Sequence, residues 1–284
     1  MLGDSEAEVE RLRFQQQVWG GVTERFLDRL GVSSGWRCVD AGCGPGFVTE
    51  ALRERVGAAG KVLAVDLSER WVEALRRRAS ERAWENVEAV AASLDTWAPP
   101  AESFDLGFLR WVLSFVADPG GLVLRLARGL RPGGLLAVED YNHEGVSLFP
   151  ESPAFRRVIE ATRRLYRSRG GDPWVATRLP ALFRDAGLEP VEYTPTVLCG
   201  GPGTDVFRWA EIFFVPHTEG MVREGFLEAR EREAFLREWE ERKRDPGALF
   251  FSPIVVDAAG KRGHAKRGQA PFPRTETEPD PFSP

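Results

Sequence analysis

No stretch of the chain stays apolar for the roughly 18 to 20 residues that a membrane-spanning helix needs. The first residues, 1 to 6, also lack the basic segment that opens a signal peptide. We therefore expect a cytoplasmic protein without a membrane span.

Cysteine is scarce as well. The chain has only Cys38, Cys43 and Cys199, an odd number without the C-x-x-C spacing of zinc sites. This pattern favours neither a disulfide framework nor a metal site. We expect all three to be small, buried apolar residues and predict no metal ligand in the chain.

The composition shows no excess of basic residues. The net charge is −5, and the sequence pI is about 5.5. These values argue against broad electrostatic capture of nucleic acid or anionic lipid, so a small molecule is the expected partner. Nothing in the sequence indicates an oligomeric state.

The 284 residues contain no internal repeat, and 43% of them are hydrophobic. Such a chain can bury a full core, either as one domain with an elaborated end or as two small domains. We favour the single elaborated domain. The last residues, from 261 to 284, are rich in proline and charge and predict a flexible tail.

What the sequence does contain is a glycine-rich turn at residues 37 to 49, RCVDAGCGPGFVT. It predicts a short buried strand, a tight turn and the start of a helix. Glycines at 42, 44 and 46 permit positive φ angles and leave room for a ligand against the backbone. In a dinucleotide-binding G-x-G-x-x-G turn the third glycine would fall at Phe47, so that reading is disfavoured.

A second apolar strand, 62 to 65, ends in Asp66, and an acid at that place can accept both hydroxyls of a ribose. Together with Asp40 and its glycines, this resembles the first two motifs of class I S-adenosylmethionine-dependent methyltransferases. The resemblance covers about 18 to 141 and continues less closely to about 258. It implies S-adenosyl-L-methionine as the cofactor.

Later segments extend the resemblance. Strand four begins with Phe104-Asp105, and a basic-Pro-Gly-Gly run, 131 to 134, precedes strand five. One position departs from the family, since Ser93 stands where an Asp commonly accepts from the adenine amino group. The resemblance implies the following cofactor-binding residues: Asp40, Gly42, Cys43, Gly44, Gly46, Asp66, Leu67, Ser93, Leu94 and Arg110.

Strands and helices alternate through residues 36 to 141, which forces a doubly wound α/β Rossmann-like sheet. The resemblance implies seven strands, mostly parallel, with an antiparallel last strand near 250–256 beside a strand at 191–198. We divide the chain into a helical preface (1–35), a methyltransferase domain (36–260) and the tail. Within the domain we expect a cofactor half (36–141) and a substrate-covering part (142–260). The latter contains a helical insertion at about 204–245.

Within these segments, the preface helix over residues 6–30 is expected to break at Gly20-Gly21. The arginines at 76, 77 and 78 are expected on a solvated face. A single charged helix is expected at about 218–244.

The substrate-side candidates are Trp19, Trp111 and Tyr141, because the family places such aromatics near the acceptor. Asp140 and His143 leave strand five at the ligand-binding edge and are the candidates for a general base. Alternatives remain: an Asp at a strand end often caps a turn, and a lone His is often structural. Methyl transfer from a sulfonium does not strictly require a base.

Absent motifs narrow the acceptor. Residues 109 to 112, LRWV, replace the Asn- or Asp-Pro-Pro-aromatic run of adenine and glutamine methylating members, and no Pro-Cys pair or metal-binding Asp-Asn is present. The resemblance then favours metal-independent transfer to a small or lipid-like acceptor, as in the ubiquinone/menaquinone-type branch. A non-catalytic cofactor-binding scaffold and a protein or RNA acceptor remain alternatives.

Overall fold

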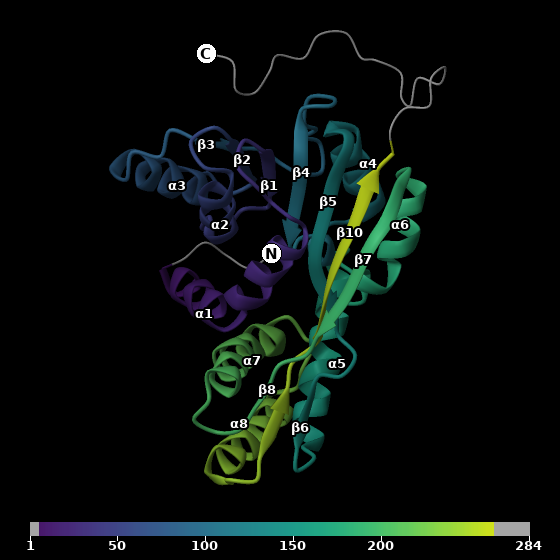
Figure 1. Ribbon diagram of the computed structural model, residues 1–284. Coiled ribbons are helices and arrows are strands. Elements are labelled where there is room, and N and C mark those ends of the chain that lie inside the picture. Colours follow the sequence, from purple (N-terminus) through teal and green to yellow (C-terminus); the bar gives the residue numbers. More distant parts are fainter. Residues whose placement is uncertain (1–5, 264–284) are drawn as a thin grey trace.

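The computed structural model describes residues 6–263. It consists of two parts that lie end to end (Figure 1). The upper part is a seven-stranded sheet in the order β3-β2-β1-β4-β5-β10-β7. The lower part, which we call the lower lobe, comprises α5, α7, α8 and a three-stranded sheet in the order β6-β9-β8. The expected fold class is therefore confirmed.

The upper sheet carries the alternation that the sequence predicts. Its elements are β1 (Arg37–Ala41), α2 (Phe47–Val56), β2 (Lys61–Asp66), α3 (Glu69–Glu81), β3 (Val87–Ala91), β4 (Phe104–Arg110), a 3-10 turn η1 (Leu113–Phe115), α4 (Pro119–Gly129) and β5 (Leu130–Asn142). The strands β1 to β5 pair in parallel. Ser68 begins α3 as expected, because its hydroxyl accepts from the Trp71 N–H at 3.3 Å.

The rest of the chain completes the sheet and builds the lower lobe. The elements are β6 (Ser147–Phe149), α5 (Pro153–Ser168), η2 (Val175–Arg178), α6 (Leu179–Asp185), β7 (Leu188–Thr196), β8 (Cys199–Gly200), α7 (Asp205–Arg223), α8 (Ala229–Arg244), β9 (Leu249–Phe251) and β10 (Ile254–Arg262). β10 runs antiparallel between β5 and β7. α7 and α8 connect β8 to β9.

Alternating side chains of the sheet enter different cores, as the two-residue period of a strand requires. Cys38 and Val62 face α1 (Glu6–Arg29) and α2, whereas Val39 and Leu63 face α4 and α6. A third core fills the lower lobe and is rich in aromatics, with Phe155 at its centre. The candidate site lies where the sheet meets the lower lobe.

Several expectations about element boundaries are wrong. α1 continues through Gly20-Gly21 because Trp19 and Val22 on either side are buried in the lower-lobe core. The 131–134 run lies inside β5, where the pairing with β4 shifts register. The charged segment forms two helices, because Gly225 has a φ of 79° and follows the end of α7.

The last strand also differs from the expectation. Residues 249–262 form two strands, β9 in the lower sheet and β10 in the upper one. β10 includes Lys261 and Arg262, so the tail cannot begin at 261; the part of the expected tail from 264 on lies outside the described residues. No helix within 6–263 is both long and apolar enough to cross a membrane.

Two expectations about side chains are wrong too. Cys199 is exposed at the start of β8, although Cys38 and Cys43 are buried. Arg78 is not simply solvated, because its Nη2 donates to the carbonyls of Pro45 and Gly46 at 2.9 and 3.2 Å. This contact ties α3 to the glycine turn.

Candidate active site

The glycine turn and the ends of β4 and β5 enclose one cavity, which we call the cofactor cavity. Its walls come from α1, the turn after β1 with the start of α2, the ends of β4 and β5, η1, and helices α5 and α7 of the lower lobe. The predicted site residues that line it are Asp40, Gly42, Cys43, Gly44, Arg110, Trp111 and Tyr141.

The turn itself needs its glycines for different reasons. Gly42, with a φ of 79°, has no room for a side chain, since an added Cβ would lie 2.4 Å from Val112 Cγ2. A Cβ added to Gly46 would likewise lie 2.7 Å from Arg78 Nη2 and 2.8 Å from Leu75 Cδ1 of α3, and Gly46 does not line the cavity. Gly44 instead faces open space, because nothing lies within 4 Å of a Cβ built on it. A ligand can approach the backbone there.

Asp66 holds the same turn from the end of β2. Its carboxylate accepts from the Gly44 N–H at 2.8 Å and from the Ser68 N–H at 2.9 Å. Each carboxylate oxygen can accept more than one hydrogen bond, so capacity remains for hydroxyl donors. Leu67, the next residue, is 51% exposed and offers an apolar surface beside the acid.

Asp40 lies at the floor of the cofactor cavity. Its carboxylate is 1% exposed and accepts from the Thr49 hydroxyl at 2.6 Å. Burial raises the pKa of Asp40 to about 6, while the Thr49 bond and the Arg110 charge act in the opposite direction. An acid in this position is complementary to a cation bound in the cavity.

The adenine-side candidates lie outside the lining of the cofactor cavity. Leu94 packs in the main core, and its carbonyl accepts from Arg125 Nη2 at 2.6 Å. The Ser93 hydroxyl accepts from the Asp95 N–H at 3.3 Å. These contacts fix the loop after β3.

An aromatic wall faces the glycine turn. Trp111 and Tyr141 stack with their ring centroids 5.7 Å apart and their planes at 8°. Trp111 adopts a φ of 54°, a conformation that costs a bulky residue about 1 to 3 kcal/mol. Its N–H still donates to the Glu139 carbonyl at 2.9 Å. The backbone conformation at Trp111 thereby directs the indole ring across the end of the sheet.

Trp19 supports this wall from behind. It is fully buried, meets Trp111 edge-on at 6.1 Å and contacts Trp209 of α7 at 5.6 Å. It does not line the cofactor cavity. Trp19 therefore acts on the site through Trp111.

Arg110 lies beside this wall. Its guanidinium lies 4.8 Å from the Trp111 ring centroid and donates to the Thr23 hydroxyl at 3.0 Å. Burial lowers the pKa of Arg110, although Glu139 and Asp40 favour its charged form. Arg110 thus joins the cavity to α1.

The two candidate bases do not line the cofactor cavity. Asp140 is fully buried and accepts from the N–H groups of Tyr141, at 2.8 Å, and Ser114, at 3.3 Å. Burial raises the pKa of Asp140 to about 6, and these bonds oppose the shift. Its contacts are those of a carboxylate that fixes η1.

His143 lies behind Tyr141. Its ring is edge-on to Tyr141 at 5.3 Å and 5.2 Å from the Tyr166 ring. Burial lowers the pKa of His143 to about 3, and the charge of Arg163 lowers it further. A ring that is so hard to protonate is a poor proton acceptor.

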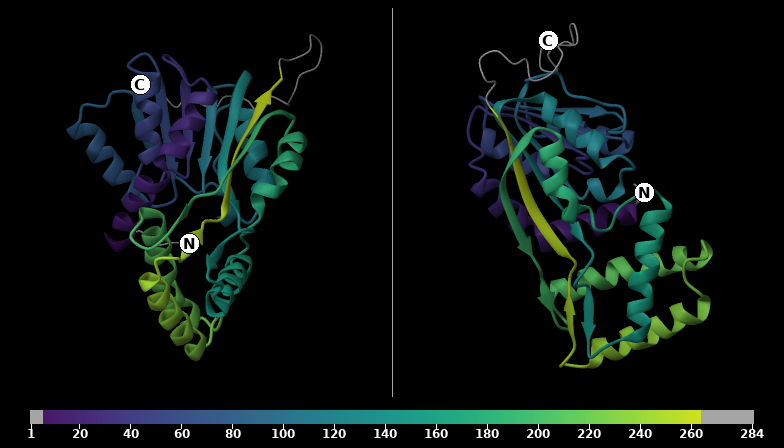
Figure 2. Two further views of the ribbon diagram at one scale, coloured as in Figure 1. Left: turned by 60° about the horizontal axis from the view of Figure 1, so that its bottom comes forward. Right: turned by 90° about the vertical axis from the view of Figure 1, so that its right-hand side faces the viewer.

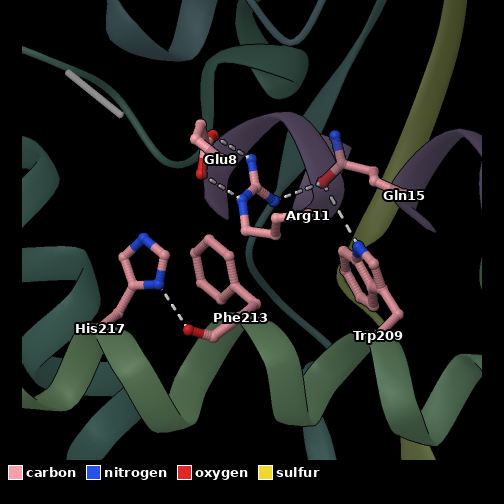
Figure 3. A network of polar contacts seen from close by, with 6 residues as sticks. All are labelled: Glu8, Arg11, Gln15, Trp209, Phe213 and His217. Carbon is pink, nitrogen blue, oxygen red and sulfur yellow. Dashed lines mark hydrogen bonds and ion pairs between the residues drawn. The ribbon is translucent and has the colours of Figure 1, made fainter. Parts of the chain in front are cut away.

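Sequence reasoning missed the lower-lobe and α1 contributions to the cavity. Phe115, Tyr166 and Phe213 line it together with Arg11 and Gln15 of α1. Figure 3 shows Arg11 between Glu8, Gln15 and Phe213. Only the concentration of aromatics near 207–214 signalled a covering role. Within 6–263, no group of three or more His, Cys, Asp or Glu side chains could hold a metal ion.

Comparison with known proteins extends these observations. Residues 39–138 match the family described as Methyltransferase domain. A trans-aconitate 2-methyltransferase of Methylobacterium nodulans is 33% identical over 199 residues, which make up 69% of this chain and 69% of that protein. A 37.1 kDa transposon protein of Streptomyces fradiae is 32% identical over 223 residues, 74% of this chain; the match spans only 59% of that relative's length.

Solved structures resemble the chain more distantly. The [4+2]-cyclase SpnF aligns with a TM-score of 0.56 and 18% identity, covering 88% of this chain and 84% of that one. At that identity the likeness concerns the fold alone. Proteins that share this fold are therefore not all named methyltransferases.

Proposed function

Because the chain belongs to the S-adenosylmethionine-dependent methyltransferase family, we propose that it moves a methyl group to an O, N or C atom of a small-molecule acceptor. One observation carries this proposal: the glycine turn and the aromatic wall face each other across a single cavity. A cofactor on the turn and an acceptor on the wall would then meet.

The residues present fit the cofactor. Gly44 leaves open space against the backbone, and Asp66 keeps acceptor capacity for the ribose hydroxyls. The Asp40 carboxylate is complementary to the ammonium of the methionine part. Leu67, Ser93 and Leu94 remain proposals for the adenine side, as do Cys43 and Gly46 for the turn.

When bound, S-adenosylmethionine supplies a methyl group on a sulfonium whose leaving group departs neutral. The chain then has to align the acceptor, and alignment at contact distance contributes about 7 to 11 kcal/mol at best. Trp111 and Tyr141 provide a rigid flat surface for this, with Trp19 behind it. The other aromatic residues that line the cavity, Phe115, Tyr166 and Phe213, exclude water from it.

We propose that Asp140 and His143 act as positioning residues. Asp140 fixes η1 through backbone N–H groups, and His143 supports Tyr141 and Tyr166. An activating base, where the acceptor needs one, has to come from a side chain that reaches the acceptor itself. Metal-independent transfer and a cytoplasmic location stay part of the proposal.

S-adenosylhomocysteine binding and methyl transfer test the proposal separately. Saturating S-adenosylhomocysteine should raise the unfolding temperature, since a ligand at 100 times its Kd stabilises by about 2.7 kcal/mol. Radiolabelled S-adenosylmethionine should then label a component of a metabolite extract. The absence of any stabilisation would refute the proposal, and binding without labelling would favour the scaffold alternative. Label in protein or RNA would favour a macromolecular acceptor.

A further inference from the structure

A second cavity adjoins the cofactor cavity inside the lower lobe. Phe115, Tyr166 and Phe213 line both cavities, so the two are adjacent. We call the second one the distal cavity. Its other lining residues come from η1, α5, the segment after it, and α7: Ser114, Thr162, Leu165, Arg169, Gly171, His217 and Met221. It is mostly apolar, and our proposed function assigns it no role.

His217 is the one histidine in this lining, and its neighbours fix its tautomer. Nδ1 lies 2.5 Å from the Phe213 carbonyl oxygen, which can only accept a hydrogen bond. In the neutral ring Nδ1 therefore carries the proton, and Nε2 presents a lone pair. Within residues 6–263, Nε2 has no hydrogen-bond partner. Figure 3 shows Nε2 pointing away from α7.

The local sequence of α7 holds the ring in this orientation. The rings of Phe213 and His217 stack one turn apart, with centroids at 4.3 Å and planes at 24°. Pro216 precedes His217 inside the helix, and Thr218 follows it and donates to the Val215 carbonyl at 2.8 Å. His217 is thus a preorganised hydrogen-bond acceptor rather than a mobile surface residue.

The charges around His217 favour its neutral form. Burial lowers the pKa of His217, and Arg11 and Arg169 lower it further, whereas the bond to the Phe213 carbonyl and the charge of Glu8 raise it. Both arginines are themselves paired with carboxylates. Arg11 Nη2 lies 2.7 Å from Glu8, and Arg169 Nη2 lies 2.9 Å from Glu224. The cavity therefore offers no uncompensated cation to an anionic acceptor.

We propose that the distal cavity holds the body of the methyl acceptor, a flat and uncharged molecule whose hydroxyl donates a hydrogen bond to Nε2 of His217. The apolar lining formed by Leu165, Tyr166, Phe213 and Met221 suits a flat apolar body. This inference rests on the proposed function, because it assumes that the neighbouring cavity holds the methyl donor. It narrows the acceptor from any small molecule to a hydroxylated aromatic.

A matched set of probes tests this chemistry: naphthalene, 2-naphthol and 2-naphthoate. Isothermal titration at pH 7 with saturating S-adenosylhomocysteine gives the affinity of each. One hydrogen bond should make 2-naphthol bind about fivefold more tightly than naphthalene. The carboxylate should give 2-naphthoate no advantage. In His217→Phe the ratio of the 2-naphthol and naphthalene affinities should fall to about one, and His217→Gln should restore part of the preference.

Other outcomes separate the two proposals. Equal binding of naphthalene and 2-naphthol, no binding of either, tightest binding of 2-naphthoate, or a preference that survives in His217→Phe would overturn this inference. S-adenosylhomocysteine binding would then still support the proposed function. A failure of S-adenosylhomocysteine to bind would refute the function itself, whatever the probes do. The affinity of His217→Phe for S-adenosylhomocysteine should match that of the parent protein.

Discussion

The cofactor side and the acceptor side of the site are built in different ways. On the cofactor side, the backbone of the glycine turn and two fixed carboxylates, Asp40 and Asp66, surround open space. On the acceptor side, aromatic side chains from the ends of β4 and β5, from η1, and from α5 and α7 converge on the cavities. The first kind of site tolerates almost no change, whereas the second can change its ligand by changing single side chains.

This contrast also explains where specificity resides. Backbone N–H groups and strand-end acids recognise one cofactor wherever the sheet is built. The lower lobe is a separate hydrophobic core that joins the sheet through β5 and β10 (Figure 2). We therefore propose that the lower lobe selects the acceptor and that substitutions in it leave the cofactor side undisturbed.

The strongest test of this contrast is Phe155→Ala. Phe155 is 2% exposed and contacts Phe214, Phe235, Trp239 and Phe250. Removing a buried phenylalanine should lower the free energy of unfolding by about 3 to 5 kcal/mol. In the fraction that stays folded, S-adenosylhomocysteine affinity should change less than about threefold, or about 0.7 kcal/mol. Urea denaturation and titration calorimetry measure the two effects.

Phe149→Ala is the matched control for that variant. Phe149 is 50% exposed, so its removal should shift stability by no more than about 0.5 kcal/mol. A large loss of S-adenosylhomocysteine affinity in folded Phe155→Ala would show that the two sides are not independent.

Gly42→Ala should instead lower the affinity for S-adenosylhomocysteine. The new Cβ would lie 2.4 Å from Val112 Cγ2 at a φ of 79°, so the turn has to move. We expect S-adenosylhomocysteine affinity to fall by at least about tenfold, which is about 1.4 kcal/mol, measured by titration calorimetry. Gly225→Ala has the same φ of 79° but open space around it. This control should lose only about 1 kcal/mol of stability and keep its cofactor affinity.

The same contrast decides how much could be predicted from the sequence. Asp40 and Asp66 lie at the ends of β1 and β2, and Gly44 lies in the turn after β1, so local patterns predict both the element and the candidate site. Tyr166 and His217 lie in helices without any local signal, and the aromatics near Phe213 indicated only a covering segment, because only the folded lower lobe brings α5 and α7 against the sheet end. The predicted element boundaries were wrong where tertiary packing overrides the local helix propensity, as at Gly20-Gly21 in α1.

Asp66→Asn should weaken the cofactor side more gently. Asparagine keeps one oxygen that can accept from the Gly44 N–H, but it loses the charge that strengthens hydrogen bonds from ribose hydroxyls. The binding free energy of S-adenosylhomocysteine should weaken by about 1 kcal/mol, or about fivefold in Kd, which competition binding measures. Asp105→Asn is the control, because Asp105 accepts from Arg37 N at the opposite end of the sheet. An equal loss in both variants would contradict a ribose role for Asp66.

Glu139→Gln tests the residue of β5 that connects the two sides through α1. Glu139 is fully buried, accepts from the Thr23 hydroxyl at 3.0 Å and lies opposite Asp257. Burial raises the pKa of Glu139 from 4.5 to about 8, although Arg110 opposes the shift. The folded chain therefore keeps this proton where the unfolded chain has lost it, so the free energy of unfolding falls as pH rises from about 4.5 to 8.

This one group contributes a slope of at most about 1.4 kcal/mol per pH unit. Glutamine stays neutral, so in urea denaturation the slope between pH 6.5 and 8 should flatten in Glu139→Gln. A slope below pH 6 should remain in both proteins, because the pKa values of Asp40, Asp140 and Asp257 are also raised, each to about 6. An unchanged slope above pH 6.5 would mean that Glu139 is ionised in the folded protein. The Arg110–Thr23–Glu139 contacts would then join the two sides as a charged network, and substitutions on the two sides would no longer be independent.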